Sequence, residues 1–172
     1  THAGGTRSRT EGAGRRARGG SPVTGGRIGG IVLAGGRSSR FGRDKLSEPI
    51  DGRPLLDRAI EAVQAVASDV VVVVAPGARR VVPPGARIVH DTDAFQGPLA
   101  GVAVGLAALE PAVERVIVVG GDMPTLAPRV LRRLAEGLGR NATAVLLGTD
   151  GEAPPLPAAY DRRAASIAVE AL

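Results

Sequence analysis

Short apolar runs alternate along this chain with segments whose apolar residues recur at helical spacing, and this alternation restricts its fold more than any other feature. Residues 70–75 consist almost entirely of valine and are followed by Pro76-Gly77, which is typical of a strand buried on both faces of a sheet. Residues 55–67 follow Pro54 and repeat apolar side chains every three or four positions. This spacing predicts an amphipathic helix with Pro54 near its start.

The same patterns extend over most of the chain. Strands are predicted at residues 31–34, 70–75, 87–89, 116–119, 144–147 and 156–160, and helices at 55–67, 98–109, 128–138 and from 161 onward. Because strands and helices alternate with short connections, we expect an α/β protein with a Rossmann-like, mostly parallel sheet and helices on both faces. Ligands bind beyond the carboxyl ends of the strands in such sheets, so the residues after each strand are the candidates for function.

The basic charge of the chain is concentrated at its start. Residues 1–27 hold six arginines and one acid, and they account for the whole formal net charge of +5. Almost no large apolar side chain lies in this stretch, so we predict a disordered Gly/Arg-rich tail over 1–27 and one folded domain over 28–172. The tail has no apolar core of a secretory signal. It fits an extended start, a transit peptide or an electrostatic tether for polyanions.

Composition excludes several classes of site. The chain has no cysteine, which rules out disulfides, thiolate metal sites and cysteine nucleophiles. Aromatic residues make up 2% of the chain, too few for the base-stacking surface of a single-strand binder. No run approaches the roughly 18 apolar residues needed to cross a bilayer. We therefore expect a cytoplasmic protein with no membrane partner, and the neutral body disfavours nucleic acid as a partner.

The loop after the first predicted strand combines glycine, hydroxyl and cationic residues. Gly35 and Gly36 allow close approach of the backbone to a ligand, and consecutive N–H groups can form an anion site. Arg40 and Lys45 supply cations suited to phosphate oxygens. The loop matches neither a Walker A motif nor a G-x-G-x-x-G fingerprint. We interpret it as a phosphate-binding loop, with a plain turn as the alternative.

Lys45 is the only lysine among 22 basic residues. A chain that otherwise uses arginine for positive charge keeps one lysine in this loop. This indicates a place where a compact ammonium group is needed and a planar guanidinium is not equivalent. The alternative is that Lys45 is present by chance and has no functional role.

Two further strand ends carry acidic residues. Asp122 follows Gly120-Gly121 at the end of the fourth predicted strand, where a carboxylate facing a phosphate loop is placed to hold Mg²⁺. Its alternative role is to cap a turn. Asp91 follows the third predicted strand and can contact ribose, base or metal. Gly97 and Gly101 bracket the start of the next helix, where a flat base or ribose can lie against the backbone.

Several of these segments together resemble the signature of the molybdenum cofactor guanylyltransferases, the MobA family. The resemblance rests on residues 33–36 with 39–45, on Asp91 with 97–101, on 122–124 and on 156–160, which lie in the family's order. It covers residues 30 to about 172. It implies a Rossmann-like nucleotidyltransferase fold and transfer of GMP from MgGTP to the terminal phosphate of molybdopterin, with release of pyrophosphate.

The resemblance also implies roles for individual residues and names the partners as GTP and molybdopterin, with Mg²⁺ as cofactor. The nucleotide-binding set is Leu33, Ala34, Gly35, Gly36, Lys45, Asp91, Gly97 and Gly101. Within it, the first three would contact guanine and ribose, and Gly36 would lie at the phosphate turn. Lys45 and Arg40 would stabilise the triphosphate, and Asp122 would bind magnesium. No protein nucleophile is required, in agreement with the absence of cysteine.

The sequence departs from the family pattern at three places, one of which is the Arg-rich tail without a counterpart in the family core, and it leaves other functions open. Val74 stands where the family usually has asparagine, and family members continue past Leu172, so we expect the domain to lack its C-terminal portion. One alternative function is a related cytidylyltransferase, or another NTP transferase of this fold acting on a different phosphorylated acceptor. Others are a non-enzymatic nucleotide-binding module and a nucleic-acid binder acting through the tail. Oligomeric state is not indicated by any pattern.

Overall fold

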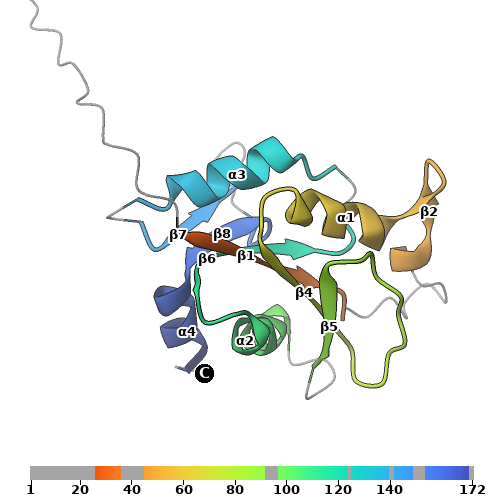
Figure 1. Ribbon diagram of the computed structural model, residues 1–172, viewed down its shortest axis with the longest axis horizontal. Coiled ribbons are helices and arrows are strands. Elements are labelled where there is room, and N and C mark those ends of the chain that lie inside the picture. The colour runs from red at the N-terminus through yellow and green to blue at the C-terminus, as the bar shows by residue number, and fades with distance from the viewer. Residues whose placement is uncertain are drawn as a thin grey trace, which may run out of the picture.

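The computed structural model describes residues 26–35, 45–91, 97–123, 125–139, 142–148 and 154–170. Their main feature is a six-stranded sheet in the order β5-β4-β1-β6-β8-β7 (Figure 1). Its strands are β1 (Arg27–Leu33), β4 (Asp69–Val74), β5 (Ala86–His90), β6 (Val113–Gly120), β7 (Ala144–Leu146) and β8 (Ala158–Asp161). The helices are α1 (Leu55–Gln64), α2 (Pro98–Ala108), α3 (Pro128–Gly137) and α4 (Arg162–Glu170). Every strand and helix predicted from the sequence is thereby confirmed, with ends shifted by a few residues.

The sheet is mostly parallel, as predicted. β4 and β6 both pair with β1 in parallel, and β5 pairs with β4 in parallel. β8 runs antiparallel to both of its neighbours, β6 and β7. Residues 147–157 separate β7 from β8, fewer than the dozen or so that a parallel crossover needs. The chain therefore returns in the opposite direction at this side of the sheet.

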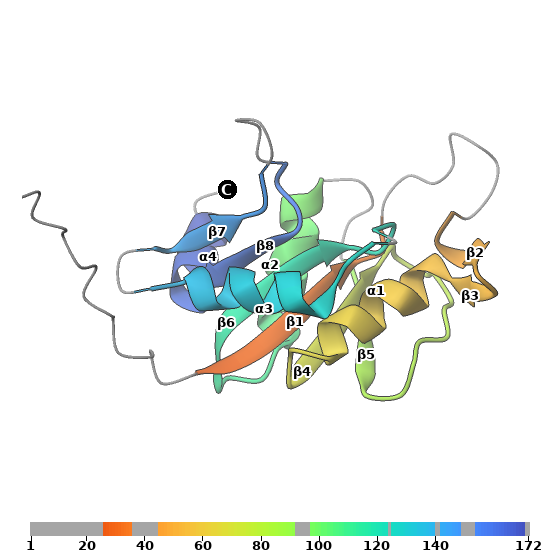
Figure 2. The same ribbon diagram turned by 90° about the horizontal axis from the view of Figure 1, so that it is seen from above.

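Helices cover both faces of the sheet, which places one apolar core on each side. α1 and α3 lie on one face, and α2 and α4 lie on the other (Figures 1 and 2). Alternate valines of β4 serve the two cores: Val70, Val72 and Val74 face α1 and α3, whereas Val71 and Val73 face α2. This two-sided burial explains why the strand reads as an unbroken valine run.

The two helices over the first face are amphipathic. α3 leaves Arg129, Arg132 and Arg133 exposed. α1 buries Leu56, Ile60 and Val63, while Leu55 at the start of the predicted helix is only half-buried. Leu56, Ile60 and Val63 are four and three residues apart and therefore share one face of the helix. Leu55 lies one position before this buried face.

On the opposite face, α2 approaches β1 closely because it contains glycines. A Cβ at Gly105 would lie 2.7 Å from Ile31 Cγ2, and one at Gly101 would lie 3.1 Å from Leu33 Cδ2. Larger residues at these positions would push the helix away from the strand. The glycines thus bring the N-terminal end of α2 against the carboxyl end of β1.

A short segment between β1 and α1 was not predicted. It consists of a 3₁₀ turn, η2 (Lys45–Ser47), and a hairpin of β2 (Pro49–Ile50) and β3 (Arg53–Pro54). The hairpin turn holds Asp51 and Gly52 at φ values of 54° and 77°, which Asp and Gly adopt readily. Arg58 on α1 fastens it by hydrogen bonds to Ile50 O and Asp51 Oδ2. Two-residue strands containing proline carry too weak a pattern to predict.

The start of the sheet lies inside the stretch predicted to be a tail. Arg27 belongs to β1 and forms a 2.8 Å ion pair with Glu110, so the sheet begins at the last residue of that stretch. Residues 1–25 of the predicted tail lie outside the described residues. Among the helices that the structure describes, none is long and apolar enough to cross a membrane.

Candidate functional site

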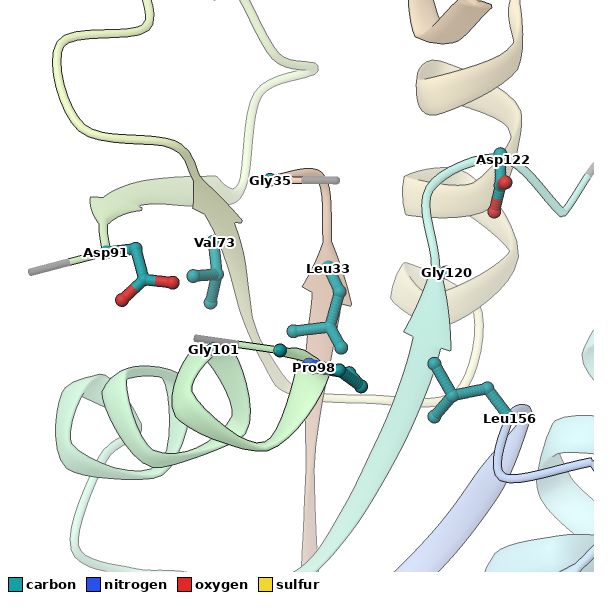
Figure 3. A pocket seen from close by; sticks show the side chains of 10 residues that line it. Leu33, Gly35, Val73, Asp91, Pro98, Gly101, Gly120, Asp122 and Leu156 are labelled. Carbon is teal, nitrogen blue, oxygen red and sulfur yellow. The ribbon is translucent and has the colours of Figure 1, made fainter. Parts of the chain in front are cut away.

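A pocket of about 620 Å³ opens at the carboxyl edge of the sheet (Figure 3). It lies where the strand order reverses, since β1 is followed by β4 and β5 on one side and has β6 on the other. Ligands of doubly wound sheets bind at this topological switch point. The pocket is lined by Leu33, Gly35, Val73, Asp91, Gly97, Pro98, Gly101, Gly120, Asp122 and Leu156.

The rear of the pocket is backbone held by hydrogen bonds between strand ends. Ala34 N donates to Val73 O at 2.7 Å, and Gly121 N donates to Leu33 O at 2.9 Å. Gly35 then passes β4 so closely that a Cβ on it would lie 3.4 Å from Ala75 N. The glycine therefore lets the backbone run against the neighbouring strand end and leaves it accessible from the pocket.

Asp91 forms one side of the pocket. Its N–H donates to Val74 O at 2.8 Å, so its backbone continues the β4–β5 ladder by one residue. Its Oδ1 is buried and has no hydrogen-bond partner among the described residues. A buried oxygen without a donor costs free energy. A ligand N–H or O–H in the pocket would supply the missing donor.

Asp122 forms the other side, on the turn that follows β6 (Figure 3). The residue is exposed, and its Oδ1 would lie 2.8 Å from a Cβ at Gly120. The carboxylate is therefore folded back over Gly120, and a side chain at position 120 would turn it away from this position. Asp122 and Gly120 line the pocket together.

The N-terminal end of α2 borders the pocket between these two carboxylates. Gly97 caps the helix at φ 93°, and Pro98 is its first residue. The first turn carries no acid, and no side chain of the residues that the structure describes caps the helix. The first N–H groups of a helix have no intrahelical acceptor and attract anions or ligand oxygens. This end of the pocket thus offers donors, whereas Asp91 and Asp122 offer acceptors.

The donor set suits a divalent cation that completes its coordination shell with ligand oxygens. Within the described ranges, no group of three or more His, Cys, Asp or Glu residues could hold a metal by itself. Magnesium is commonly bound through one or two carboxylates together with substrate phosphates. Asp122, exposed and lining the pocket, fits that requirement, and Asp91 offers a second carboxylate across the same pocket.

The structure brings together six of the residues predicted from the sequence: Leu33, Gly35, Asp91, Gly97, Gly101 and Asp122. Ala34 is instead buried in the core beneath α1 and α3, so its side chain faces away from the pocket. Lys45 is exposed at the start of η2 and is not among the pocket-lining residues. Gly36 and Arg40 lie outside the described residues.

Four lining residues were not predicted: Val73, Pro98, Gly120 and Leu156. Val73 lies in a uniform valine run, where the sequence does not show which member ends beside a ligand pocket. Leu156 comes from a segment more than thirty residues after β6 and joins the pocket only through tertiary packing. Pro98 follows Gly97 within segment 97–101, which carries the family resemblance, and Gly120 lies two residues before Asp122, so both were close to residues predicted for the site. Val74, where the family usually has asparagine, is fully buried in the α1 and α3 core.

Residues 30–172 match the family model of the MobA-like NTP transferase domain. A probable molybdenum cofactor guanylyltransferase of Geobacillus is 29% identical over 143 residues, which cover 80% of this chain and 71% of the relative. The one of Pyrococcus horikoshii is 35% identical over 136 residues, covering 76% of this chain and 68% of the relative. The match therefore spans about 70% of the length of these relatives.

Solved structures share the fold. Molybdopterin-guanine dinucleotide biosynthesis protein A of Archaeoglobus fulgidus superposes with a TM-score of 0.64 and 24% identity, covering 83% of this chain and 71% of that chain. A Mycobacterium tuberculosis protein solved as a manganese complex superposes with a TM-score of 0.63 and 20% identity, covering 83% and 75%. At these identities the likeness supports the α/β nucleotidyltransferase fold.

Proposed function

Since this chain belongs to the MobA-like NTP transferase family of nucleotidyltransferases, we propose that it transfers GMP from GTP to molybdopterin. The proposed acceptor follows from the names of the relatives, which are probable molybdenum cofactor guanylyltransferases. In this reaction an oxygen of the acceptor phosphate attacks the α-phosphorus of GTP. The bond from the α-phosphorus to the bridging oxygen breaks, and pyrophosphate leaves with the bonding electron pair.

The observation that carries the proposal is the pocket at the switch point, with Asp91 and Asp122 on opposite sides of a glycine-rich backbone. Its volume of about 620 Å³ is within the roughly 300–1,000 Å³ usual for small-molecule sites. The polar groups available there are carboxylate oxygens and backbone N–H groups. Such a site binds and orients a nucleotide and needs no protein nucleophile, as is usual in phosphoryl transfer.

The chain's own residues take the following parts in the proposal. Leu33 and Gly35 present backbone and an apolar surface to the nucleoside, and Asp91 accepts a hydrogen bond from it through the unpartnered Oδ1. Gly97 and Gly101 keep the end of α2 close to the nucleoside. Lys45 and Arg40 neutralise charge on the triphosphate and the departing pyrophosphate, and Gly36 lets the backbone approach the phosphates.

The proposed cofactor is Mg²⁺, held by Asp122 together with the phosphates. A bound Mg²⁺ would withdraw charge from the phosphate oxygens and favour departure of pyrophosphate. The manganese complex of the Mycobacterium tuberculosis protein supports a divalent cation in a protein of this fold. Asp122 itself contributes by holding a fixed negative charge at the edge of the pocket nearest β6.

Nucleotide binding and turnover test the proposal separately. Thermal unfolding is measured with GTP, CTP, ATP and UTP, each with and without Mg²⁺, and pyrophosphate release is then followed with molybdopterin as acceptor. A ligand at 100 times its dissociation constant adds about 2.7 kcal/mol of stability, which shifts the melting temperature visibly. We expect a Mg²⁺-dependent shift with GTP and pyrophosphate release only when molybdopterin is present.

The alternatives give different results in the same experiment. A shift with CTP in place of GTP would indicate a cytidylyltransferase. Binding of GTP without pyrophosphate release would indicate a nucleotide-binding module. A chain that no nucleotide stabilises would contradict the proposed function.

A further inference from the structure

Three segments that are distant in sequence meet behind Gly121, the residue immediately before Asp122. Gly121 N–H donates to Leu33 O at 2.9 Å. A Cβ on Gly121 would lie 2.9 Å from Leu56 Cδ1 and 3.4 Å from Leu46 Cδ2. The carboxyl ends of β1 and β6 are thus joined here, and the first turn of α1 and the turn η2 close over the joint because position 121 has no side chain.

Leu46 is the buried member of η2. It is 6% exposed, whereas its neighbours Lys45 and Ser47 are exposed. It packs in the core formed with α1 and α3, which also contains Leu56 and Val119. One buried apolar side chain therefore attaches this three-residue turn to the core, while the two polar residues of the turn are exposed.

Backbone hydrogen bonds hold η2 to the start of α1 in the same place. Glu48 N donates to Lys45 O at 3.2 Å, and Leu55 N donates to Glu48 O at 3.1 Å. Since Leu55 is the first residue of α1, these bonds connect Lys45 to the helix that packs against the β6 turn. The position of the Lys45 backbone is consequently set by the same joint that carries Asp122.

We infer that Leu46 is a positioning residue, which holds Lys45 in place relative to Asp122 by docking against Gly121 and Leu56. The inference rests on the proposed function, in which Lys45 and Asp122 serve the triphosphate part of one nucleotide. Electrostatic stabilisation of that group depends on the placement of the charges, and a displacement of about 1 Å can lower a rate about 100-fold. Asp91 and Gly101, which serve the nucleoside, lie outside this joint, and Leu33 takes part in it through its carbonyl oxygen.

The test compares Leu46→Ala with Leu138→Ala. Leu138 is 5% exposed in the same core, beside the end of α3, so both variants remove a buried leucine of equal size. The dissociation constants of GTP and of GMP are measured for each variant with Mg²⁺. Leu46→Met, which keeps the volume and apolar character, is the rescue variant.

We expect Leu46→Ala to weaken GTP binding about 10-fold or more while leaving GMP binding within about twofold, because only the triphosphate loses its partner. Leu138→Ala should leave the ratio of the GTP and GMP dissociation constants unchanged. Leu46→Met should restore the wild-type preference for GTP. In the Lys45→Ala background, Leu46→Ala should have little further effect on GTP binding, because both changes act through one group. Equal effects of Leu46→Ala and Leu138→Ala on the GTP-to-GMP ratio would overturn the inference, as would additive effects of Leu46→Ala and Lys45→Ala.

Hydrogen exchange separates a failure of this inference from a failure of the proposed function. Leu46→Ala should speed exchange of the Glu48 and Leu55 amides, whose bonds hold η2, in the protein without nucleotide. Leu138→Ala should leave these two amides unchanged relative to the rest of the chain. Unchanged exchange in Leu46→Ala would contradict the anchoring itself. A wild-type protein that binds no nucleotide would refute the proposed function, and the exchange result would still decide whether Leu46 anchors η2.

Discussion

The backbone N–H of Asp91 lies 2.8 Å from the carbonyl oxygen of Val74 and donates a hydrogen bond to it. This bond follows directly on the last β4–β5 register pair, Val74 with His90, so the ladder fixes the Asp91 backbone. Its side chain has a different environment, because Oδ1 is buried without a partner in the described part of the chain. A rigid backbone thus presents an acceptor whose donor is missing, which is an arrangement suited to binding a ligand.

The first prediction concerns Asp91→Ala. Removal of the unpartnered carboxylate should weaken nucleotide binding about 10-fold or more, while the free energy of unfolding stays the same or rises by about 1 kcal/mol. Titration of GTP and thermal unfolding measure the two effects. A loss of stability that accompanies the loss of binding would show that the carboxylate supports the fold.

The second prediction concerns Asp122→Ala. The proposed cation ligand should be essential for turnover, so we expect the rate to fall about 100-fold or more. Because Asp122 is exposed, thermal unfolding should be unaffected. Pyrophosphate release measures the rate. Glu136→Ala, at an exposed position of α3, is the control and should behave as wild type; a near-normal rate in Asp122→Ala would remove this residue from the mechanism.

The third prediction is that the free energy of unfolding depends on pH through Asp69. This residue begins β4 and so lies at the edge of the sheet opposite the pocket. Asp69 is buried at 7% exposure, and it accepts hydrogen bonds from Arg87 Nη2 at 2.8 Å and from Glu110 N at 2.8 Å. Burial by itself raises the pKa of Asp69, but these hydrogen bonds and the charges of Arg87 and Arg27 outweigh it and lower the pKa below the usual value. The unfolded chain therefore binds a proton more readily than the folded one.

It follows that Asp69 contributes stability above its unfolded pKa, about 4, and that this contribution is lost as the pH falls through the lower folded pKa. The free energy of unfolding should decrease on acidification below about pH 4. Asp69→Asn should lower stability by about 2–3 kcal/mol at pH 7 and flatten the acid dependence. Urea unfolding at a series of pH values measures both effects, and an equally steep acid dependence in Asp69→Asn would contradict the assignment.

The fourth prediction concerns Arg162 at the start of α4. Its guanidinium donates to the carbonyl oxygens of Leu106 at 3.2 Å, of Leu109 at 3.3 Å and of Val113 at 3.3 Å, and also to that of Glu110. It thereby caps the C-terminal end of α2 and ties this helix to β6. Arg162→Met should destabilise the protein by about 2–3 kcal/mol without changing GTP affinity.

Chemical denaturation of Arg162→Met, with Arg163→Met as control, tests this capping role. Arg163 is the exposed neighbour on the same helix, so its loss should change stability by less than about 0.5 kcal/mol. If the two variants were equally stable, the capping by Arg162 would be of no energetic consequence.

The strands and helices were predictable because their patterns are local. The valine run of β4 has the length and β-branched composition of a strand buried on both faces, and the apolar residues of α1 recur with a period of 3.6 residues. Neither pattern needs knowledge of distant partners. The hairpin of β2 and β3 escaped prediction because two-residue strands are too short to show a period. The antiparallel direction of β8 depends on the length of the connection from β7 and on which edge it reaches, and neither is expressed in residue type.

The candidate site was predictable where a polar residue comes directly after a strand. Asp91 and Asp122 each stand just after an apolar run, and the rule that parallel strands share a carboxyl edge brings them to one pocket. Ala34 was grouped with its glycine neighbours, but the alternation of a strand turns its side chain into the opposite core. Leu156 belongs to segment 156–160, which carries the family resemblance, but no local pattern shows that its side chain packs against the core and lines the pocket.

The sequence by itself determined the α/β class, the parallel core of the sheet and the strand ends that carry polar residues, because these depend on hydrophobic period and chain order. Only the tertiary structure decided which of those residues share a cavity and which oxygen lacks a donor. It also decided that Leu46 anchors the turn carrying Lys45 against Gly121. Such contacts join residues far apart in the chain, and they are fixed by side-chain volume and backbone approach in three dimensions, which no pattern along one dimension records.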